Sequence, residues 1–389
     1  MKKISILGST GSIGLNTIKI IKKKNFFKFY ILAADKNYKL ICKQIKELKP
    51  KIFIINNYKV FKKIKEKFKN KNLKIINNIN SLKKLNISDI TISAIPGIAG
   101  LNSTIELTKK SKKILIANKE SVICGWNLIK SAALKNNTQI IPVDSEHFSI
   151  MKLIQNHKIN HIKKIYLTAS GGPFLNYKLS KLKKIKPYQA IKHPKWKMGK
   201  KISIDSASLM NKILEVIEAK KIFSIDLKNI EIVIHPESLV HAIIELKNGL
   251  YKFIYHETTM LIPLANAIFD DDIDVTEFIE TNIKKNKKIF FKNLNFKNVD
   301  EKIFPLFKLK SKIFEYPSTP IIINAANEVI VGQFLKKRIP FSSFYNLILG
   351  VLRDRNYRKY AVKEPKNLNQ IYLIDKWTRS TTLKKIECL

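Results

Sequence analysis

Cysteine is scarce in this chain. Only three occur among 389 residues, at Cys42, Cys124 and Cys388. Their number is odd and they share no metal-ligand spacing, so we expect a reducing, cytosolic setting and no thiolate metal site. Cys124 could be proposed as a nucleophile, but the sequence shows no partner residue for that role. We therefore expect the side chain of Cys124 to be buried.

Long apolar runs are also missing. No segment approaches 18 uninterrupted apolar residues, which argues against a membrane-spanning helix. The chain begins with two lysines and a short apolar run in MKKISILGST, but Gly8 arrives too soon for the apolar core of a secretion signal. The sequence also contains no internal repeat. We therefore expect neither secretion nor a membrane partner.

Arginine is rare although the formal net charge is +43. Lysine and arginine together number 73, and only five of these are arginine, the better bidentate reader of phosphate and guanine. Clustered lysines can bind nucleic acid through its phosphates, so a basic nucleic-acid-binding protein remains an alternative. Lysine, isoleucine and asparagine are all in excess, as expected when a gene favours codons rich in A and T. We favour a solvated lysine coat without specific nucleic-acid binding.

The length predicts two or three domains, and the 45% hydrophobic content is typical of a folded protein. Within the first 140 residues, β-rich runs alternate with segments of helical periodicity. The candidate strands are 3–8, 29–35, 51–56, 89–95, 112–118 and 138–143. This pattern predicts an α/β fold with a mostly parallel sheet and helices on both faces, as in Rossmann-like domains.

From about residue 160 the pattern of apolar and polar residues changes. We predict a helix at 208–223 and strands at 230–236 and 241–256, the second strand broken by Asn248 and Gly249 as a hairpin. The remainder is mainly of helical character. The predicted division is a Rossmann-like domain, an α+β catalytic domain, a connecting arm and a C-terminal helical domain, at 1–143, 144–270, 271–300 and 301–389.

A glycine-rich segment, GSTGSIG, runs from Gly8 to Gly14 directly after the first candidate strand. Glycines there permit a tight turn, and the next helix would point its free N–H groups at a pyrophosphate. We favour a dinucleotide site over an ordinary turn. Three residues at the end of the second strand bear on the choice of cofactor. Asp35 could bind the 2′-hydroxyl of the ribose and so favours NAD, whereas Lys36 and Asn37 could bind the 2′-phosphate and so favour NADP. The residues alone leave this choice open.

Two acids, Asp144 and Glu146, follow the last candidate strand of the first region. If the segment is extended, alternate side chains share a face and the two carboxylates meet. Two such charges are costly together without a cation, and oxygen ligands suit Mg²⁺ or Mn²⁺. The alternative is a surface loop whose acids pair with lysines.

Further polar residues occur on the predicted helix. Asn211 and Glu215 lie four residues apart with Lys212 beside them, so one face would offer a metal ligand and phosphate donors; a solvated face is the alternative. Ser206 lies just before this group. Ser170 precedes two glycines, in either a phosphate loop or a plain turn.

We predict a loop at 193–199, HPKWKMG, whose large apolar residues could close over a substrate or belong to the core. We call this segment the lid loop. Of the other histidines, we expect His235 and His241 to be structural. A semialdehyde dehydrogenase type of Rossmann oxidoreductase is a third candidate function. It would need a catalytic cysteine.

The ordered motifs GSTGSIG, ANKES, PVDSEH, SGGPF, HPKWKMGKKISIDSASLMNK, LEVIEA and NAANEV resemble those of the 1-deoxy-D-xylulose 5-phosphate reductoisomerase family. The resemblance spans residues 1 to about 340, and the lysine-rich character is similar to that of A/T-rich, endosymbiont-like bacteria. It implies rearrangement and NADPH-dependent reduction of this substrate to 2-C-methyl-D-erythritol 4-phosphate in non-mevalonate isoprenoid biosynthesis. It also implies a divalent cation (Mg²⁺, Mn²⁺ or Co²⁺) and a homodimer.

The resemblance also implies a role for individual residues. Catalysis would involve Lys119 and Glu146, and the metal ligands would be Asp144, Glu146 and Glu215. The substrate-binding residues would be Lys119, Ser145, Glu146, Ser170, His193, Ser206, Asn211, Lys212 and Glu215. The NADPH-binding residues would be Thr10, Gly11, Ser12, Ile13, Lys36, Asn37, Asn118, Glu120 and Gly199. Trp196 and Met198 would cap the substrate.

Three departures from the family pattern bear on function. The family usually has glycine where Asp35 stands; the carboxylate of Asp35 could repel the 2′-phosphate of NADPH, and Lys36 could offset that repulsion. It usually has glycine where Ile213 follows the helix lysine. Its element GxPDMRxPI appears here only as HETTMLIPL, at 256–264, without the arginine. These departures favour reduced efficiency over a new function.

Overall fold

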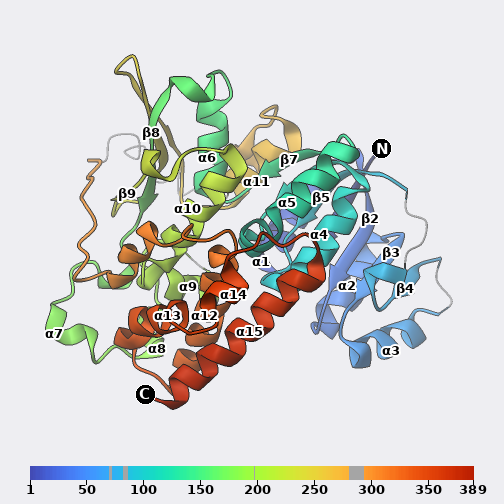
Figure 1. Cartoon of the computed structure of the whole chain (residues 1–389). Coiled ribbons are helices and arrows are strands. Elements are labelled where there is room, and N and C mark those ends of the chain that lie inside the picture. Colours follow the sequence, from blue (N-terminus) through green and yellow to red (C-terminus); the bar gives the residue numbers. More distant parts are fainter. Residues whose placement is uncertain (70–71, 82–85, 197, 280–292) are drawn as a thin grey trace. The chain divides into compact units, whose positions relative to one another are not determined.

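The computed structural model of the chain describes residues 1–69, 72–81, 86–196, 198–279 and 293–389 (Figure 1). Lys197 of the lid loop and residues 280–292 of the expected connecting arm lie outside the described residues. The chain forms two compact units. The first unit contains Met1–Ser121, Gly125–Phe148 and Met260–Phe290, and the second contains Val122–Cys124, Ser149–Thr259 and Phe291–Leu389.

The first unit is built on a parallel sheet of seven strands in the order β4-β3-β2-β1-β5-β6-β7. The strands are β1 (Lys2–Leu7), β2 (Phe27–Ala34), β3 (Ile52–Ile55), β4 (Lys74–Ile76), β5 (Ser88–Ser93), β6 (Ser111–Ile116) and β7 (Gln139–Pro142). All six predicted strands are present, which confirms the α/β fold class. Strand β4 was not predicted, because three residues are too few to show a period.

Apolar runs explain why these segments form the centre of a sheet. Ile4, Ile6 and Leu7 of β1 are completely buried, and β3 is buried along its whole length. Burial of successive residues means that both faces are covered, as expected for a parallel sheet flanked by helices. The helices of this unit include α1 (Ser12–Lys22), α2 (Tyr38–Leu48), α3 (Tyr58–Lys67), α4 (Leu101–Thr108), α5 (Lys119–Lys135) and α11 (Leu261–Phe269).

The polar residues singled out in the first unit all follow the carboxyl ends of strands. The glycine-rich loop follows β1, Asp35 follows β2, Asn118 follows β6, and Asp144 follows β7. Because parallel strands end at the same edge of a sheet, these loops lie along one edge, where doubly wound folds bind their ligands. The sheet therefore positions these loops at one edge of the first unit.

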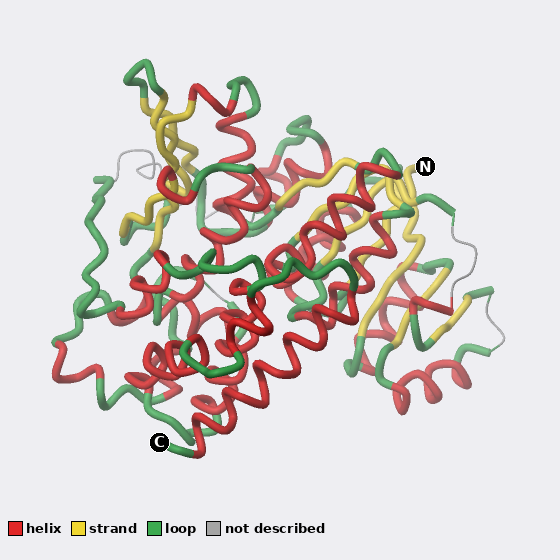
Figure 2. Tube along the Cα trace, in the orientation of Figure 1, coloured by secondary structure: helices red, strands yellow, loops and turns green. Residues whose placement is uncertain are grey.

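The second unit contains a four-stranded sheet in the order β11-β10-β8-β9. Strands are drawn in yellow in Figure 2. Its strands are β8 (Ile162–Ala169), β9 (Ile230–Ile234), β10 (Val240–Leu246) and β11 (Tyr251–Tyr255). Strands β10 and β11 are antiparallel, and Gly249 in their turn has φ of +87°. The predicted hairpin is thus confirmed, with glycine at the one turn position that needs a left-handed backbone.

Helices make up most of the rest of the second unit. They include α9 (Lys200–Ala207), α10 (Met210–Phe223), α12 (Thr319–Leu335), α13 (Phe344–Leu352), α14 (Tyr357–Ala361) and α15 (Leu368–Glu387). Arg379 on α15 forms ion pairs with Glu328 of α12 and with Asp375. The helical C-terminal region is confirmed. Among the described residues, no helix has both the length and the apolar character needed to cross a membrane.

Candidate active site

The glycine-rich loop between β1 and α1 is closely packed. Gly8 has φ of +85°, and a Cβ there would lie 2.5 Å from the carbonyl oxygen of Ala94. A Cβ on Gly14 would lie 2.4 Å from the carbonyl oxygen of Gly8. Larger residues would therefore push the helix away from the strand. Gly11 precedes α1 without any side-chain cap, so the first-turn N–H groups can bind an anion.

Three exposed residues follow β2, at the position where a dinucleotide fold recognises the adenosine ribose. The Oδ1 atom of Asn37 accepts a hydrogen bond from the backbone N–H of Leu40 at 3.2 Å and caps α2. Asn37 therefore has a structural part in starting this helix. Asp35 and Lys36 place opposite charges side by side in solvent.

Asn118 joins two loops at the carboxyl edge of the sheet. Its Oδ1 accepts from the N–H of Ser121 at 3.2 Å, and its Nδ2 donates to the carbonyl oxygens of Ile95 and Gly97. Its side chain is buried, and a Cβ on Gly100 would lie 2.3 Å from its Nδ2. Asn118 thus fixes the start of α5, where Lys119 and Glu120 follow.

Lys119 and Asp144 form an ion pair at this edge. The Nζ atom of Lys119 lies 3.3 Å from Oδ2 of Asp144, and Lys119 is only 8% exposed. Burial tends to raise the pKa of the Asp144 carboxyl, but the ammonium of Lys119 and the nearby ring of His147 hold that pKa well below its ordinary value. Asp144 is therefore ionised at neutral pH, as a metal ligand must be.

The expectation that Asp144 and Glu146 lie in an extended segment is wrong. Strand β7 ends at Pro142, and helix α6 (Ser145–Ile154) begins directly after Asp144, whose carbonyl oxygen accepts from the N–H of Phe148 at 2.8 Å. Acids favour a helix start because the positive end of the helix dipole stabilises them. The two carboxylates are thus placed by a first helical turn, and Ser145 Oγ donates to Glu146 Oε2.

His147 is a residue that sequence reasoning missed. It is completely buried on α6, and its Nδ1 lies 3.6 Å from Oδ1 of Asp144. A helix interpretation of the segment would have indicated this contact, because residues three apart share a helix face.

In the second unit, the predicted face of α10 is confirmed. Glu215 is completely buried, and it accepts hydrogen bonds from Lys212 Nζ at 2.6 Å and from Asn211 Nδ2. Lys212 is buried as well, so the solvated-face alternative is wrong. Ile213 packs into the core on the same helix. A buried carboxylate held by an ammonium and an amide is an arrangement typical of functional sites.

The turn between α9 and α10 contains an unusual backbone. Leu209 is buried and has φ of +65° and ψ of +4°, a left-handed conformation that is uncommon for a residue with a branched side chain. This turn ends α9 just after Ser206 and starts α10 just before Asn211. Strained turns of this kind are concentrated at functional sites.

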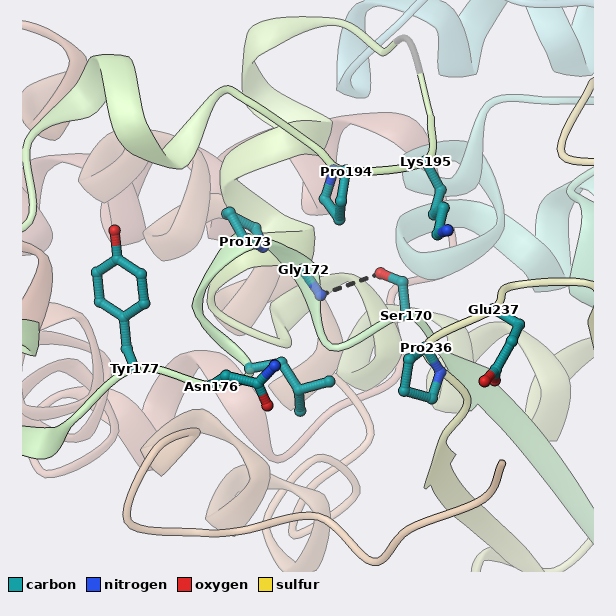
Figure 3. A pocket seen from close by; sticks show the side chains of 10 residues that line it. Ser170, Gly172, Pro173, Asn176, Tyr177, Pro194, Lys195, Pro236 and Glu237 are labelled. Carbon is teal, nitrogen blue, oxygen red and sulfur yellow. Dashed lines mark hydrogen bonds between the residues drawn. The ribbon is translucent and has the colours of Figure 1, made fainter. Parts of the chain in front are cut away.

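Ser170 follows β8 in a loop that glycines hold close to α9. Gly171 and Gly172 have φ of +76° and +61°, and a Cβ on Gly172 would lie 3.0 Å from Cα of Ala207. The N–H of Gly172 donates to Oγ of Ser170 at 3.0 Å (Figure 3). This loop borders a cavity of about 470 Å³, which is also lined by Lys195 and Glu237.

The imidazole of His193 forms hydrogen bonds with the backbone of the lid loop. Its Nδ1 accepts from the backbone N–H groups of Lys195, at 3.1 Å, and Trp196, at 2.9 Å. Nδ1 therefore carries no proton, and Nε2–H donates to Oγ of Ser170 at 2.9 Å. Because Ser170 Oγ accepts from both Gly172 and His193, its own proton is left to donate outward.

Burial, together with the charge of Lys212, lowers the pKa of His193 to about 4. The ring is therefore neutral at physiological pH. Gly199, by contrast, is exposed at the start of α9 with open space around it.

The lowered pKa of His193 predicts a stability change in acid. An unfolded histidine titrates near 6.5, so between about pH 4 and 6.5 the unfolded chain binds the proton and the folded chain does not. The free energy of unfolding should therefore fall as the pH falls through this window. Uptake of one proton by the unfolded chain alone would lower it by ~1.4 kcal/mol per pH unit. The decline should be smaller than this because the side chain is partly exposed to solvent. The measurement is denaturant unfolding at pH 7, 6 and 5. His193→Gln should show a shallower decline than the wild type, and equal declines would contradict this assignment.

Three family models match most of the chain. The model described as 1-deoxy-D-xylulose 5-phosphate reductoisomerase matches residues 4–125, and that of the C-terminal domain of the same enzyme matches residues 140–223. A further model, described as DXP reductoisomerase C-terminal domain, matches residues 257–381.

Relatives and solved structures agree with these matches. The 1-deoxy-D-xylulose 5-phosphate reductoisomerase of Pelagibacter ubique is 44% identical over 381 residues, covering 95% of this chain and 96% of that protein. The Zymomonas mobilis enzyme in complex with NADPH aligns over all of both chains with a TM-score of 0.88 and 30% identity. A DOX-P reductoisomerase in complex with NADPH, fosmidomycin and magnesium aligns over 100% of this chain and 98% of its own, with a TM-score of 0.90 and 29% identity.

Proposed function

The chain belongs to the 1-deoxy-D-xylulose 5-phosphate reductoisomerase family, and from this premise we propose how its own residues carry out the reaction. The enzyme uses NADPH and a divalent cation to rearrange and reduce 1-deoxy-D-xylulose 5-phosphate to 2-C-methyl-D-erythritol 4-phosphate, in non-mevalonate isoprenoid biosynthesis. The observation that best supports the proposed residue roles is the buried Lys212–Glu215 pair on α10.

Asp144, Glu146 and Glu215 are the proposed metal ligands. Their carboxylate oxygens are the donors that Mg²⁺ and Mn²⁺ prefer, and Co²⁺ accepts them as well. Asp144 is ionised beside Lys119 in the first unit, and Glu215 is buried beside Lys212 in the second, so each carboxylate is held in place by a neighbouring ammonium. When bound, the cation stabilises the negative charge that develops on the substrate oxygens during the carbon rearrangement.

Lys119 and Glu146 are the proposed catalytic residues. The ammonium of Lys119 is held in place by Asp144 and would stabilise charge, or donate a proton, at the reacting oxygens. Ser145 and His193 would complete the contacts to the substrate. Trp196 and Met198 of the lid loop would cover it and exclude water.

Four residues form the proposed phosphate site. Ser170 has a proton to donate because its oxygen already accepts from His193 and Gly172. Ser206 and Asn211 add neutral donors at the ends of two helices, and Lys212 adds the one full positive charge. Several positioned donors and one ammonium suffice to match phosphate oxygens.

For NADPH, the proposed residues are those of the glycine-rich loop and its neighbours. The pyrophosphate would lie against the start of α1, with the adenosine ribose near Lys36 and Asn37. The full proposed set is Thr10, Gly11, Ser12, Ile13, Lys36, Asn37, Asn118, Glu120 and Gly199. A homodimer, a cytoplasmic location and the four-part domain division are proposed from the family resemblance alone.

The experiment that tests the function is NADPH oxidation with 1-deoxy-D-xylulose 5-phosphate, with and without Mg²⁺ or Mn²⁺. Turnover should require the cation. Metal-independent turnover, or no turnover with either metal, would refute the proposal. The dehydrogenase alternative is not favoured, because Cys124 is only 3% exposed and contacts Asn324 inside the second unit.

Asp35 gives a separate prediction about cofactor preference. Its exposed carboxylate stands where it would repel the 2′-phosphate of NADPH and could accept from the ribose hydroxyl of NADH. Asp35→Asn should raise the ratio of kcat/KM with NADPH to that with NADH by about 2- to 5-fold, the size of one exposed charge interaction. Glu66→Gln, an exposed acid in the same unit, is the control and should leave the ratio unchanged. An unchanged ratio in Asp35→Asn would remove Asp35 from cofactor selection.

A further inference from the structure

Two buried histidines stack against each other in the second unit. The rings of His241 and His256 have centroids 3.7 Å apart and planes inclined by 12°. His241 lies on β10, and His256 follows β11 directly. The register of these antiparallel strands shifts between Val240 and Ala242, so His241 stands at an irregularity of the ladder. Such irregularities re-aim a side chain, and here the ring of His241 meets that of His256.

Backbone carbonyl groups fix the orientation of both rings. Nε2 of His241 lies 3.1 Å from the carbonyl oxygen of His256, and Nδ1 of His256 lies 2.7 Å from the carbonyl oxygen of Glu257. A carbonyl oxygen only accepts, so each of these nitrogens carries a proton and donates it. The two rings therefore have defined tautomers when neutral, and each is held by both a hydrogen bond and the stack.

The stack continues to the lid loop. The indole of Trp196 lies with its centroid 6.0 Å from that of His241, at an angle of 79°. This is the edge-to-face geometry that aromatic rings prefer. The backbone N–H of Trp196 in turn donates to His193, which donates to Ser170. A continuous line of contacts thus runs from His256 through His241 and Trp196 to the proposed phosphate loop.

We propose that His256 is a positioning residue for Trp196: by stacking on His241 it orients the ring against which the indole of Trp196 packs. This inference rests on the proposed function, because Trp196 is taken to cover the substrate. A glycine at position 256 would offer no ring, so the imidazole of His256 supplies a support for the stack on Trp196 that His256→Gly removes.

The experiment is a double-mutant cycle between His256→Gly and Trp196→Ala, read out by steady-state kinetics with Mg²⁺ present. His256→Gly alone should raise KM for 1-deoxy-D-xylulose 5-phosphate by about 2- to 10-fold, the effect of one aromatic pair, with a smaller change in kcat. In the Trp196→Ala background the same substitution should change KM by less than 2-fold, because the ring it supports is gone. His256→Phe keeps a flat ring and should restore the wild-type KM to within about 2-fold.

Controls separate positioning from loss of structure. Phe296→Ala removes one ring of a comparable stack, on His235 at 4.8 Å, and should leave KM unchanged. Denaturant unfolding reports whether each variant is folded, and His256→Phe provides the test if His256→Gly is not. Additive effects in the cycle, or a His256→Phe variant no better than His256→Gly, would overturn the inference. A wild type without NADPH oxidation would instead refute the proposed function.

Discussion

Glu215→Gln is expected to abolish NADPH oxidation with 1-deoxy-D-xylulose 5-phosphate, lowering kcat/KM by about 10³-fold or more, as loss of a charged metal ligand commonly does. The substitution keeps the shape of the side chain but removes its charge. It also removes the charge of the carboxylate that pairs with the buried ammonium of Lys212; in the wild type, Nζ of Lys212 lies 2.6 Å from Oε2 of Glu215. Both effects act on the same proposed centre, since a cation and a phosphate would be held by neighbouring residues of α10.

Binding of Mn²⁺, followed by electron paramagnetic resonance without substrate, provides a readout that does not depend on turnover. We expect Mn²⁺ affinity to fall by at least 10-fold in Glu215→Gln, the lower end of the range for disturbed metal sites. Glu315→Gln replaces an exposed acid of the same unit and serves as the control. If Glu215→Gln bound Mn²⁺ as tightly as the wild type, Glu215 would not be a ligand. Cys42→Ala and Cys124→Ala should remain active, which the dehydrogenase alternative does not predict.

Lys212→Ala is expected to have the second largest effect, a fall in kcat/KM of about 10²- to 10³-fold, mainly through KM. Lys212 is the one full positive charge in the proposed phosphate site, and it is buried, so solvent screens it little. Removing one member of a buried charged pair typically costs about 3–5 kcal/mol, because the partner is left uncompensated. Part of the loss will therefore be a loss of stability.

Inorganic phosphate separates these two contributions. As a competitive inhibitor it should bind Lys212→Ala at least 10-fold more weakly than the wild type, even at a temperature where both proteins are folded. Lys228→Ala, an exposed lysine of the same unit, is the matched control and should leave phosphate inhibition unchanged. The nucleic-acid alternative predicts the opposite pattern: salt-sensitive DNA binding that is indifferent to either substitution. Equal phosphate affinity in Lys212→Ala and the wild type would exclude Lys212 from the phosphate site.

Much of the fold could be predicted because it depends on local patterns. The six predicted strands and the helix at 208–223 follow from the spacing of apolar residues, and the hairpin follows from Asn248 and Gly249. The face shared by Asn211, Lys212 and Glu215 follows from helix geometry alone. Strand β4 was not predicted because it is too short to show a periodic pattern.

The error at Asp144 and Glu146 has a specific cause. An acidic pair after a strand was interpreted as a continuation of the strand, whereas the same residues are also favoured at the start of a helix. Had the helix been recognised, His147 would have been placed beside Asp144 as well. A local pattern that suits two structures is decided by packing, and the burial of His147 and Phe148 shows which structure packs here.

The sequence by itself determined six of the seven strands of the parallel sheet, the glycines at the turn after β1, the polar face of α10 and the family to which the chain belongs. Only the tertiary structure decided that Lys119 meets Asp144, that His193 is neutral and donates to Ser170, and that His256 stacks on His241. The physical reason is one of range. Periodicity and turn chemistry act between residues close in the chain, but ion pairing, loss of solvation and ring stacking join residues that only strand pairing and helix packing bring together.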